Sequence, residues 1–231
     1  MPITANNLIG AGSAASQNSY TTASYTPTTD RIVLIAVSNP RGAGSPNTPT
    51  ISGNSMTWTQ IRTFLDASAS LRRLTVFRGV ATAPSTGTIV INFAGQSQDS
   101  CMWSITEYDG TDTTGTNGSN AIVQSVTGEA NGTSTGVTAT LAAFSNVNNA
   151  TYGVVRHNSN GLAITQGSGF TEINEISITN NRSQTEFKDT NDTTVDWSWS
   201  STSLNATAIA IELKSLTQAP APETSNLFLV F

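Results

Sequence analysis

Short apolar runs, each bounded by Gly, Pro, Asn or Ser, are the feature that most constrains how this chain can fold. No stretch keeps apolar residues at helical spacing for long enough to predict an amphipathic helix. RIVLIAVS at residues 31–38 is almost continuously apolar, which predicts a central strand buried on both faces. TVDWSWS at residues 194–200 alternates and puts two tryptophans on one face. The pattern predicts an all-β fold, a two-sheet antiparallel β-sandwich of jelly-roll type.

The chain of 231 residues is interpreted as a single sandwich domain over residues 1–214, and residues 1–14 are expected to form an N-terminal arm. Residues 215–231 are expected to form a Pro-containing C-terminal arm. The single cysteine, Cys101, cannot form an internal disulfide. Residues 39–55 are rich in Gly and Pro and predict a long loop, which is a candidate contact surface.

The arm ends in five apolar residues, which are unfavourable in water. They can fold back as an edge strand of the same sandwich, or they can dock on a neighbouring subunit as an added strand. The candidate assembly residues are Leu227, Phe228, Leu229, Val230 and Phe231.

Charged residues make up only 11% of the chain, so Thr, Ser, Asn and Gln must supply its polar surface. The ten basic residues and the net charge of −5 argue against binding to nucleic acid or to an anionic membrane. The first twenty residues lack the basic and apolar regions of a signal peptide, and no run is long enough to span a membrane. We therefore expect synthesis in a host cytoplasm and a place on a virion surface, or alternatively on an extracellular surface.

One acidic cluster resembles a catalytic motif. In ITEYDGTD, Glu107 and Asp109 point to the same side of a strand and Asp112 follows them. The spacing is similar to the E-x-D-x-x-E motif of laminarinase-like glycoside hydrolases. The resemblance implies that Glu107 is the nucleophile, Asp109 its electrostatic partner and Asp112 the acid/base. An Asp stands where that family has Glu, and the segment has turn composition, so we interpret it as a strand that ends in a solvated acidic loop.

Other candidate sites are weaker. The single histidine, His157, is expected in a solvated turn. Oxygen ligands of the kind that Ca²⁺ prefers occur at Asp189, Asn191 and Asp192, but no EF-hand loop is complete, so neither a metal nor a cofactor is expected. Trp58 and Trp199 are candidates for stacking on a sugar, although their aliphatic neighbours favour core packing.

The pattern of strands over residues 15–214 resembles the β-sandwich decoration and accessory proteins of tailed bacteriophage virions. The resemblance is carried by RIVLIAVSN, by VFRGVATAPSTGTIVINF and by SITEYDG. It implies a homo-oligomer, typically a trimer, bound to a capsid or tail lattice through arms and loops.

The leading hypothesis is therefore a non-enzymatic structural virion protein that decorates a capsid or a tail. The alternative is a carbohydrate-binding, lectin-like attachment module with a surface glycan as its partner. A laminarinase-like glycoside hydrolase is a minor alternative.

Overall fold

A computed structural model describes residues 2–67, 70–83, 85–132, 134–201 and 205–216. These residues form sixteen strands and one short 3₁₀ helix, Ser119–Ala121 (η1), and all strand pairs are antiparallel. The expected all-β sandwich is confirmed, but the described strands form four sheets instead of the two that were expected from the sequence. The jelly-roll type stays a prediction.

The strands fall into two sets of eight in chain order, which we call the first half and the second half. The first half contains β1 (Thr4–Ser13), β2 (Ser19–Thr21), β3 (Ile32–Pro40), β4 (Thr50–Gly53), β5 (Thr59–Leu65), β6 (Arg72–Val80), β7 (Ile89–Asn92) and β8 (Cys101–Asp109). The second half contains β9 (Ile122–Asn131), β10 (Gly136–Thr140), β11 (Ala150–His157), β12 (Thr165–Gln166), β13 (Thr171–Ile178), β14 (Asn181–Lys188), β15 (Thr194–Ser198) and β16 (Asn205–Leu213).

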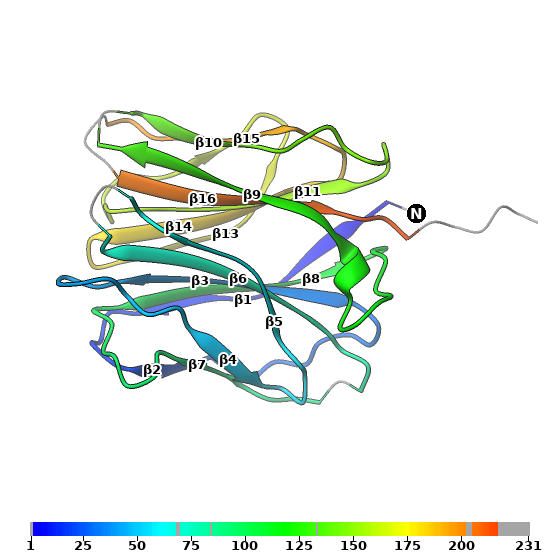
Figure 1. Ribbon diagram of the computed structural model, residues 1–231, viewed down its shortest axis with the longest axis horizontal. Coiled ribbons are helices and arrows are strands. Elements are labelled where there is room, and N and C mark those ends of the chain that lie inside the picture. Colours follow the sequence, from blue (N-terminus) through cyan, green and yellow to red (C-terminus); the bar gives the residue numbers. More distant parts are fainter. Residues whose placement is uncertain (1, 68–69, 84, 133, 202–204, 217–231) are drawn as a thin grey trace, which may run out of the picture.

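The two halves have the same topology. The five-stranded sheets run β1-β8-β3-β6-β5 and β9-β16-β11-β14-β13, and the three-stranded sheets run β2-β7-β4 and β10-β15-β12. Each strand of the first half therefore has a counterpart eight strands later. The four sheets stack as layers, with the five-stranded sheets in the middle and the three-stranded sheets outside (Figure 1).

The duplication extends to individual residues. Asn6 and Val33 flank Glu107 on the two neighbouring strands of β8, and Gln124 and Thr151 flank Glu212 on β16 in the same way. The edge strands also match, because β5 and β13 each carry a register shift at the same place, within Thr59-Gln60-Ile61-Arg62 and Thr171-Glu172-Ile173-Asn174. A β-bulge at equivalent positions indicates that the two halves share one backbone plan.

The halves pack as a two-fold axis would place them. β1 of the first half contacts β13, and its counterpart β9 contacts β5, the counterpart of β13. In a symmetric pair, a contact between two surfaces recurs with the partners exchanged. The central core between the five-stranded sheets draws from both halves, including Leu34 and Tyr108 from the first and Tyr152 and Ile211 from the second.

Each half has a second core between its larger and its smaller sheet. In the second half the small side chains of Ala206, Ala208 and Ala210 lie in this core with Trp197. Gly153 completes the fit, because an added Cβ would lie 2.6 Å from the Trp197 ring. The close approach of a second sheet therefore explains why this face carries small residues.

Two predictions about segments were wrong. Most of residues 1–14 form no free arm, because Thr4–Ser13 is the edge strand β1 and pairs along its length with β8. Residues 39–55 are not one long loop, since they contain β4, and Asn47 between the strands is held by Gln96 and Phe93. Long-range pairing provides the hydrogen bonds that local sequence does not reveal.

Candidate functional site

Glu107 is a buried glutamate at the end of β8, with a relative exposure of 1%. Its carboxylate accepts hydrogen bonds from Asn6 Nδ2 (3.0 Å), from Thr28 Oγ1 (2.9 Å), from the Thr28 backbone N–H (2.8 Å) and from Arg31 Nη1 (3.0 Å). Burial raises the pKa of Glu107, but the hydrogen bonds from Thr28 and Asn6 and the charge of Arg31 outweigh it, so the pKa lies below its usual value. The residue expected as a possible nucleophile is therefore enclosed by donors.

Glu212 is the counterpart of Glu107 on β16 and is fully buried. Its carboxylate accepts from Gln124 Nε2 (2.6 Å), from Asn149 Nδ2 (2.6 Å), and from both the backbone N–H (3.1 Å) and the hydroxyl (3.2 Å) of Ser145. The set repeats that of the first half. An amide on the neighbouring strand, a hydroxyl residue that donates twice, and a residue just before the central strand surround each carboxylate.

We call each set of contacts a glutamate cage. Glu107 on β8 and Glu212 on β16 each lie on the strand face that packs against the three-stranded sheet of the same half. Each glutamate lies at the point where that smaller sheet ends. The donor loops there lead into the central strands β3 and β11. Each cage thus ties the entry of the central strand to the last strand, and each carboxylate accepts hydrogen bonds from four donors, three at Oε1 and one at Oε2. This arrangement favours a structural role for Glu107 over a catalytic one.

The two aspartates of the glycosidase-like motif are ion-paired. Asp109 is half exposed and receives Arg31 Nη2 at 3.2 Å, while Asp112 receives Lys214 Nζ at 2.8 Å. The hydrogen bonds from Lys214 and Thr114 lower the pKa of Asp112. A glycosidase acid needs a raised pKa, so this direction is opposite to the role that the resemblance implies.

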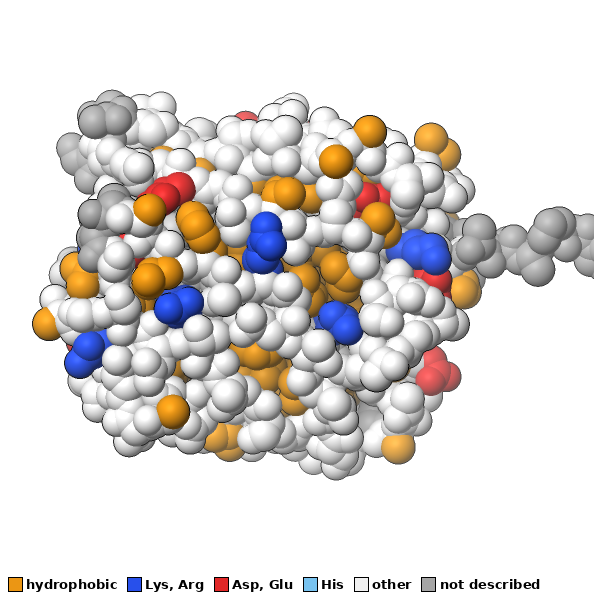
Figure 2. Space-filling view, in the orientation of Figure 1, with side chains coloured by type: hydrophobic (Ala, Val, Ile, Leu, Met, Phe, Trp, Pro, Cys, Tyr) orange, Lys and Arg blue, Asp and Glu red, His pale blue; other side chains and the backbone are white. Residues whose placement is uncertain are grey.

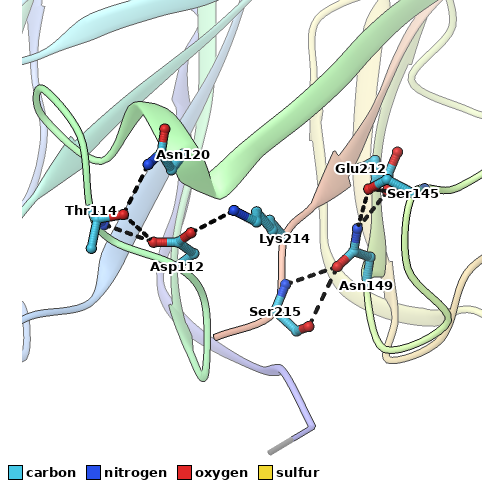
Figure 3. A network of polar contacts seen from close by, with 8 residues as sticks. All are labelled: Asp112, Thr114, Asn120, Ser145, Asn149, Glu212, Lys214 and Ser215. Atoms are coloured by element: carbon cyan, nitrogen blue, oxygen red, sulfur yellow. Dashed lines mark hydrogen bonds and ion pairs between the residues drawn. The ribbon is translucent and has the colours of Figure 1, made fainter. Parts of the chain in front are cut away.

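Asp112 belongs instead to a junction between the halves (Figure 3). Its backbone N–H donates to the Lys214 carbonyl, and the Lys214 N–H donates to Ala121, so residues 110–121 are bound to the segment after β16. On the other side, Ser215 donates from its backbone N–H to Asn149 Oδ1 (3.0 Å). Asn149 also contacts Glu212, which joins the junction to the second glutamate cage (Figure 3). This network is not predictable from the sequence, because its members are far apart in the chain.

Of the three candidate calcium ligands, Asp192 is engaged with protein groups. Asp192 receives Lys188 Nζ at 2.7 Å and the Thr194 backbone N–H at 2.9 Å. Neither Asp189 nor Asn191 forms a side-chain hydrogen bond or ion pair with Asp192. Among the described residues, no group of three or more His, Cys, Asp or Glu side chains could hold a metal ion. The Lys188 ammonium occupies the place where a cation would neutralise Asp192.

Trp199 and the histidine lie inside the fold, and Trp58 is partly buried. Trp199 is 5% exposed in the core of the second half and donates its indole N–H to the Ser134 carbonyl, so the prediction that it could stack on a sugar is wrong. Trp58 is half-buried, and its N–H donates to Gly53. His157 is fully buried against Trp199, in contrast to the solvated turn that the sequence indicated. Burial lowers the pKa of His157 to about 4, with further lowering by the charges of nearby arginines.

The surface that remains is mostly neutral and polar. Figure 2 shows a face on which a few basic and acidic side chains and scattered apolar ones lie among uncharged polar side chains and backbone. On a lateral edge of the molecule, a cleft of about 520 Å³ separates β1 from β13 and the end of β14. We call it the β1–β13 cleft; its walls include Ile3, Ala5, Ile173 and Phe187.

The expected assembly residues Leu227, Phe228, Leu229, Val230 and Phe231 lie outside the described residues. The described chain ends at Leu216, which is 46% exposed, and its N–H donates to Gly110. In the described part of the chain, no helix is long and apolar enough to cross a membrane. Comparisons with protein-family models, with curated proteins and with solved structures found no match to this chain.

Proposed function

We propose that this protein is a non-enzymatic structural component of a virion, which decorates a capsid or a tail and forms repeated contacts between subunits. The observation that carries the proposal is that the acidic side chains with the potential for catalysis serve as structural contacts. The caged Glu107 and the ion-paired Asp112 are both engaged in contacts that hold the fold together. A protein that coats a particle needs a rigid body and an inert surface, and low charge with neutral polar cover supplies the second.

The route of the chain also supports the proposal. The described chain ends at Leu216 on the surface, and fifteen further residues follow in the sequence. The last five of these are apolar, and burying them on a neighbour would gain about 1.5–3 kcal/mol for each large side chain before ordering costs. Repeated weak contacts of this kind add up on a lattice. The assembly is proposed as a homo-oligomer, typically a trimer, on a capsid or tail surface.

The experiment compares three chains by light scattering in line with size exclusion. They are the full-length chain, a chain that ends at Asn226 and a chain that ends at Leu216. We expect an oligomer for the full-length chain and a monomer for both truncated chains, with unchanged circular dichroism. Equal monomer masses for all three would contradict assembly through residues 227–231. Sedimentation with purified capsids or tails then tests the virion role, because only the full-length chain should pellet with them.

A further inference from the structure

The duplicated topology allows the two lateral edges of the molecule to be compared. On one edge, the β1–β13 cleft lies between β1, β13 and the end of β14. On the opposite edge, the counterpart strands β9, β5 and β6 meet in the same arrangement. If the two edges were built alike, a second cleft of the same kind would lie there.

The second edge is filled by residues 110–121, which connect the two halves. The Asn117 side chain donates to the Thr57 carbonyl (2.8 Å) and to Thr59 Oγ1 (3.0 Å), and its Oδ1 accepts from the Val80 backbone N–H (3.3 Å). Arg78 Nε donates to the Asn117 carbonyl at 3.1 Å. This connection therefore covers the groove between β5, β6 and β9, and a hollow of about 340 Å³ remains beside it.

The walls of the two grooves correspond residue by residue. Thr59 pairs with Arg78 in the first half, and Thr171 pairs with Phe187 in the second. Two residues before each threonine lie Thr57 and Gly169, and two residues after Arg78 and Phe187 lie Val80 and Asp189. The four residues that Asn117 contacts thus have as counterparts four residues that line the β1–β13 cleft, namely Gly169, Thr171, Phe187 and Asp189.

The covering segment on the first edge directly follows β8, so its counterpart is the segment that directly follows β16. The two segments begin side by side, because Thr111 and Ser215 form a bridge and the Leu216 N–H donates to Gly110. From Gly110 the first segment needs seven residues to reach Asn117, and seven residues after Ser215 lead to Pro222. A chain of seven residues spans at most about 25 Å. Pro2 lines the cleft and also lies against Gly110, so the described chain ends near the mouth of the cleft.

We propose that residues 217–223 of the same chain occupy the β1–β13 cleft. Their sequence is TQAPAPE. Its alternating Ala and Pro residues suit the walls of this cleft better than a polar side chain like that of Asn117 would. The polar Arg78 of the first groove is replaced by Phe187, and Thr57 by Gly169, which makes the second groove more apolar. Alternating Ala and Pro in an extended conformation present small apolar groups to an aromatic wall at a low entropic cost.

This placement does not depend on the virion role. It does define where residues 227–231 start, since they follow the end of the cleft at the lateral edge. A same-chain spacer held in the cleft would direct the apolar end outward to a neighbour and would reduce the freedom lost when that neighbour is bound.

The test is a site-specific crosslink in the full-length chain. Glu172 lines the cleft and is exposed, and its counterpart Gln60 lies on the filled edge and is also exposed. The variants Glu172→Cys with Ala221→Cys, and Gln60→Cys with Ala221→Cys as the matched control, are treated with a short bismaleimide. The native Cys101 is fully buried and should not react.

We expect an intrachain crosslink in most molecules of the Glu172 variant and in few or none of the control. A link between two chains, seen as a doubled mass in a denaturing gel, would overturn the same-chain occupant. No link at all, or equal linking in both variants, would overturn the placement in the cleft. Because the readout is a contact within one chain, it can succeed or fail independently of oligomer mass and particle binding.

As a second measurement, the chain that ends at Leu216 should lose hydrogen-exchange protection at residues 4–7 and 171–173. A synthetic peptide of residues 217–225 should restore it, and a peptide of residues 226–231 should not. Unchanged protection after truncation would contradict the proposal.

Discussion

Replacing Glu212 by glutamine tests whether the glutamate cages hold the fold together. The change keeps the size of the side chain but turns one acceptor oxygen into an NH₂ group. If the NH₂ takes the place of Oε2, it faces the amide nitrogen of Gln124. If it takes the place of Oε1, it faces the donors of Ser145 and Asn149. In either orientation at least one charge-assisted hydrogen bond is lost and two donors oppose each other.

The neighbours cannot adapt without further losses. Gln124 uses its Oε1 to accept from the Ala142 N–H (2.9 Å) and its Nε2 to donate to the Ala142 carbonyl (3.1 Å), so turning its amide would break both bonds. Asn149 is held in the same way, because its Oδ1 accepts from Ser215. A hydrogen bond to a charged group contributes about 1.5–3 kcal/mol, and removing a buried charge returns part of its desolvation cost. We expect a loss of about 2–4 kcal/mol in the free energy of unfolding.

The assay is urea unfolding at pH 7, followed by tryptophan fluorescence. The same loss should lower the melting temperature by about 4–16 °C, from about 2–4 °C per kcal/mol for a protein of this size. Glu107→Gln is the matched control, since its cage includes Arg31, which has 28% side-chain exposure and can be solvated by water. Its effect should be smaller. A loss below about 0.5 kcal/mol for Glu212→Gln, within the range of ordinary surface substitutions, would refute the reasoning.

Three further outcomes are expected. Burial raises the pKa of Glu186 to about 8; because its unfolded form ionises near pH 4.5, the folded state binds more protons between these values, and stability should fall with rising pH by up to about 1.4 kcal/mol per pH unit. Glu186→Gln should remove this slope in calorimetric melting from pH 5 to 8, and an unchanged slope would contradict the assignment. Gly153→Ala should cost about 1–3 kcal/mol by overpacking against Trp197, whereas Gly161→Ala, with no atom within 4 Å of the added Cβ, should have little effect in the same urea assay. Asn117→Ala should cost about 2–3 kcal/mol, because it removes several hydrogen bonds at a backbone φ of 50°, and Asn117→Gly should cost less; equal losses would show that the φ angle is unimportant.

The sequence by itself determined the strands of the cores. RIVLIAVS became the buried central strand β3, and the alternating face of Trp197 and Trp199 became the core of the second half. Both predictions succeed because apolar spacing depends only on neighbours along the chain, and a strand that buries a face must show it in a period of two.

The candidate site was less readable, because its signals are divided between distant segments. Asn6 and Glu107 are separated by 101 positions, and Gln124 and Glu212 by 88. The two cages also use different residues in equivalent roles, such as Arg31 in one and Asn149 in the other. A comparison of TQIR at residues 59–62 with TEIN at residues 171–174 was a signal of the repeat that could have been found.

Only the tertiary structure decided which strands pair, how many sheets form and which polar groups are engaged in hydrogen bonds or ion pairs. Residues 4–13 lack strong alternation, yet they form β1 because β8 offers them a complete ladder of backbone hydrogen bonds. From the sequence, Glu107 was a candidate for catalysis. In the structure, the backbone N–H of Thr28 donates a hydrogen bond to its carboxylate. Local sequence specifies the strands. Which strands pair across about a hundred residues depends on the whole fold, because buried backbone and polar groups must find hydrogen-bond partners there.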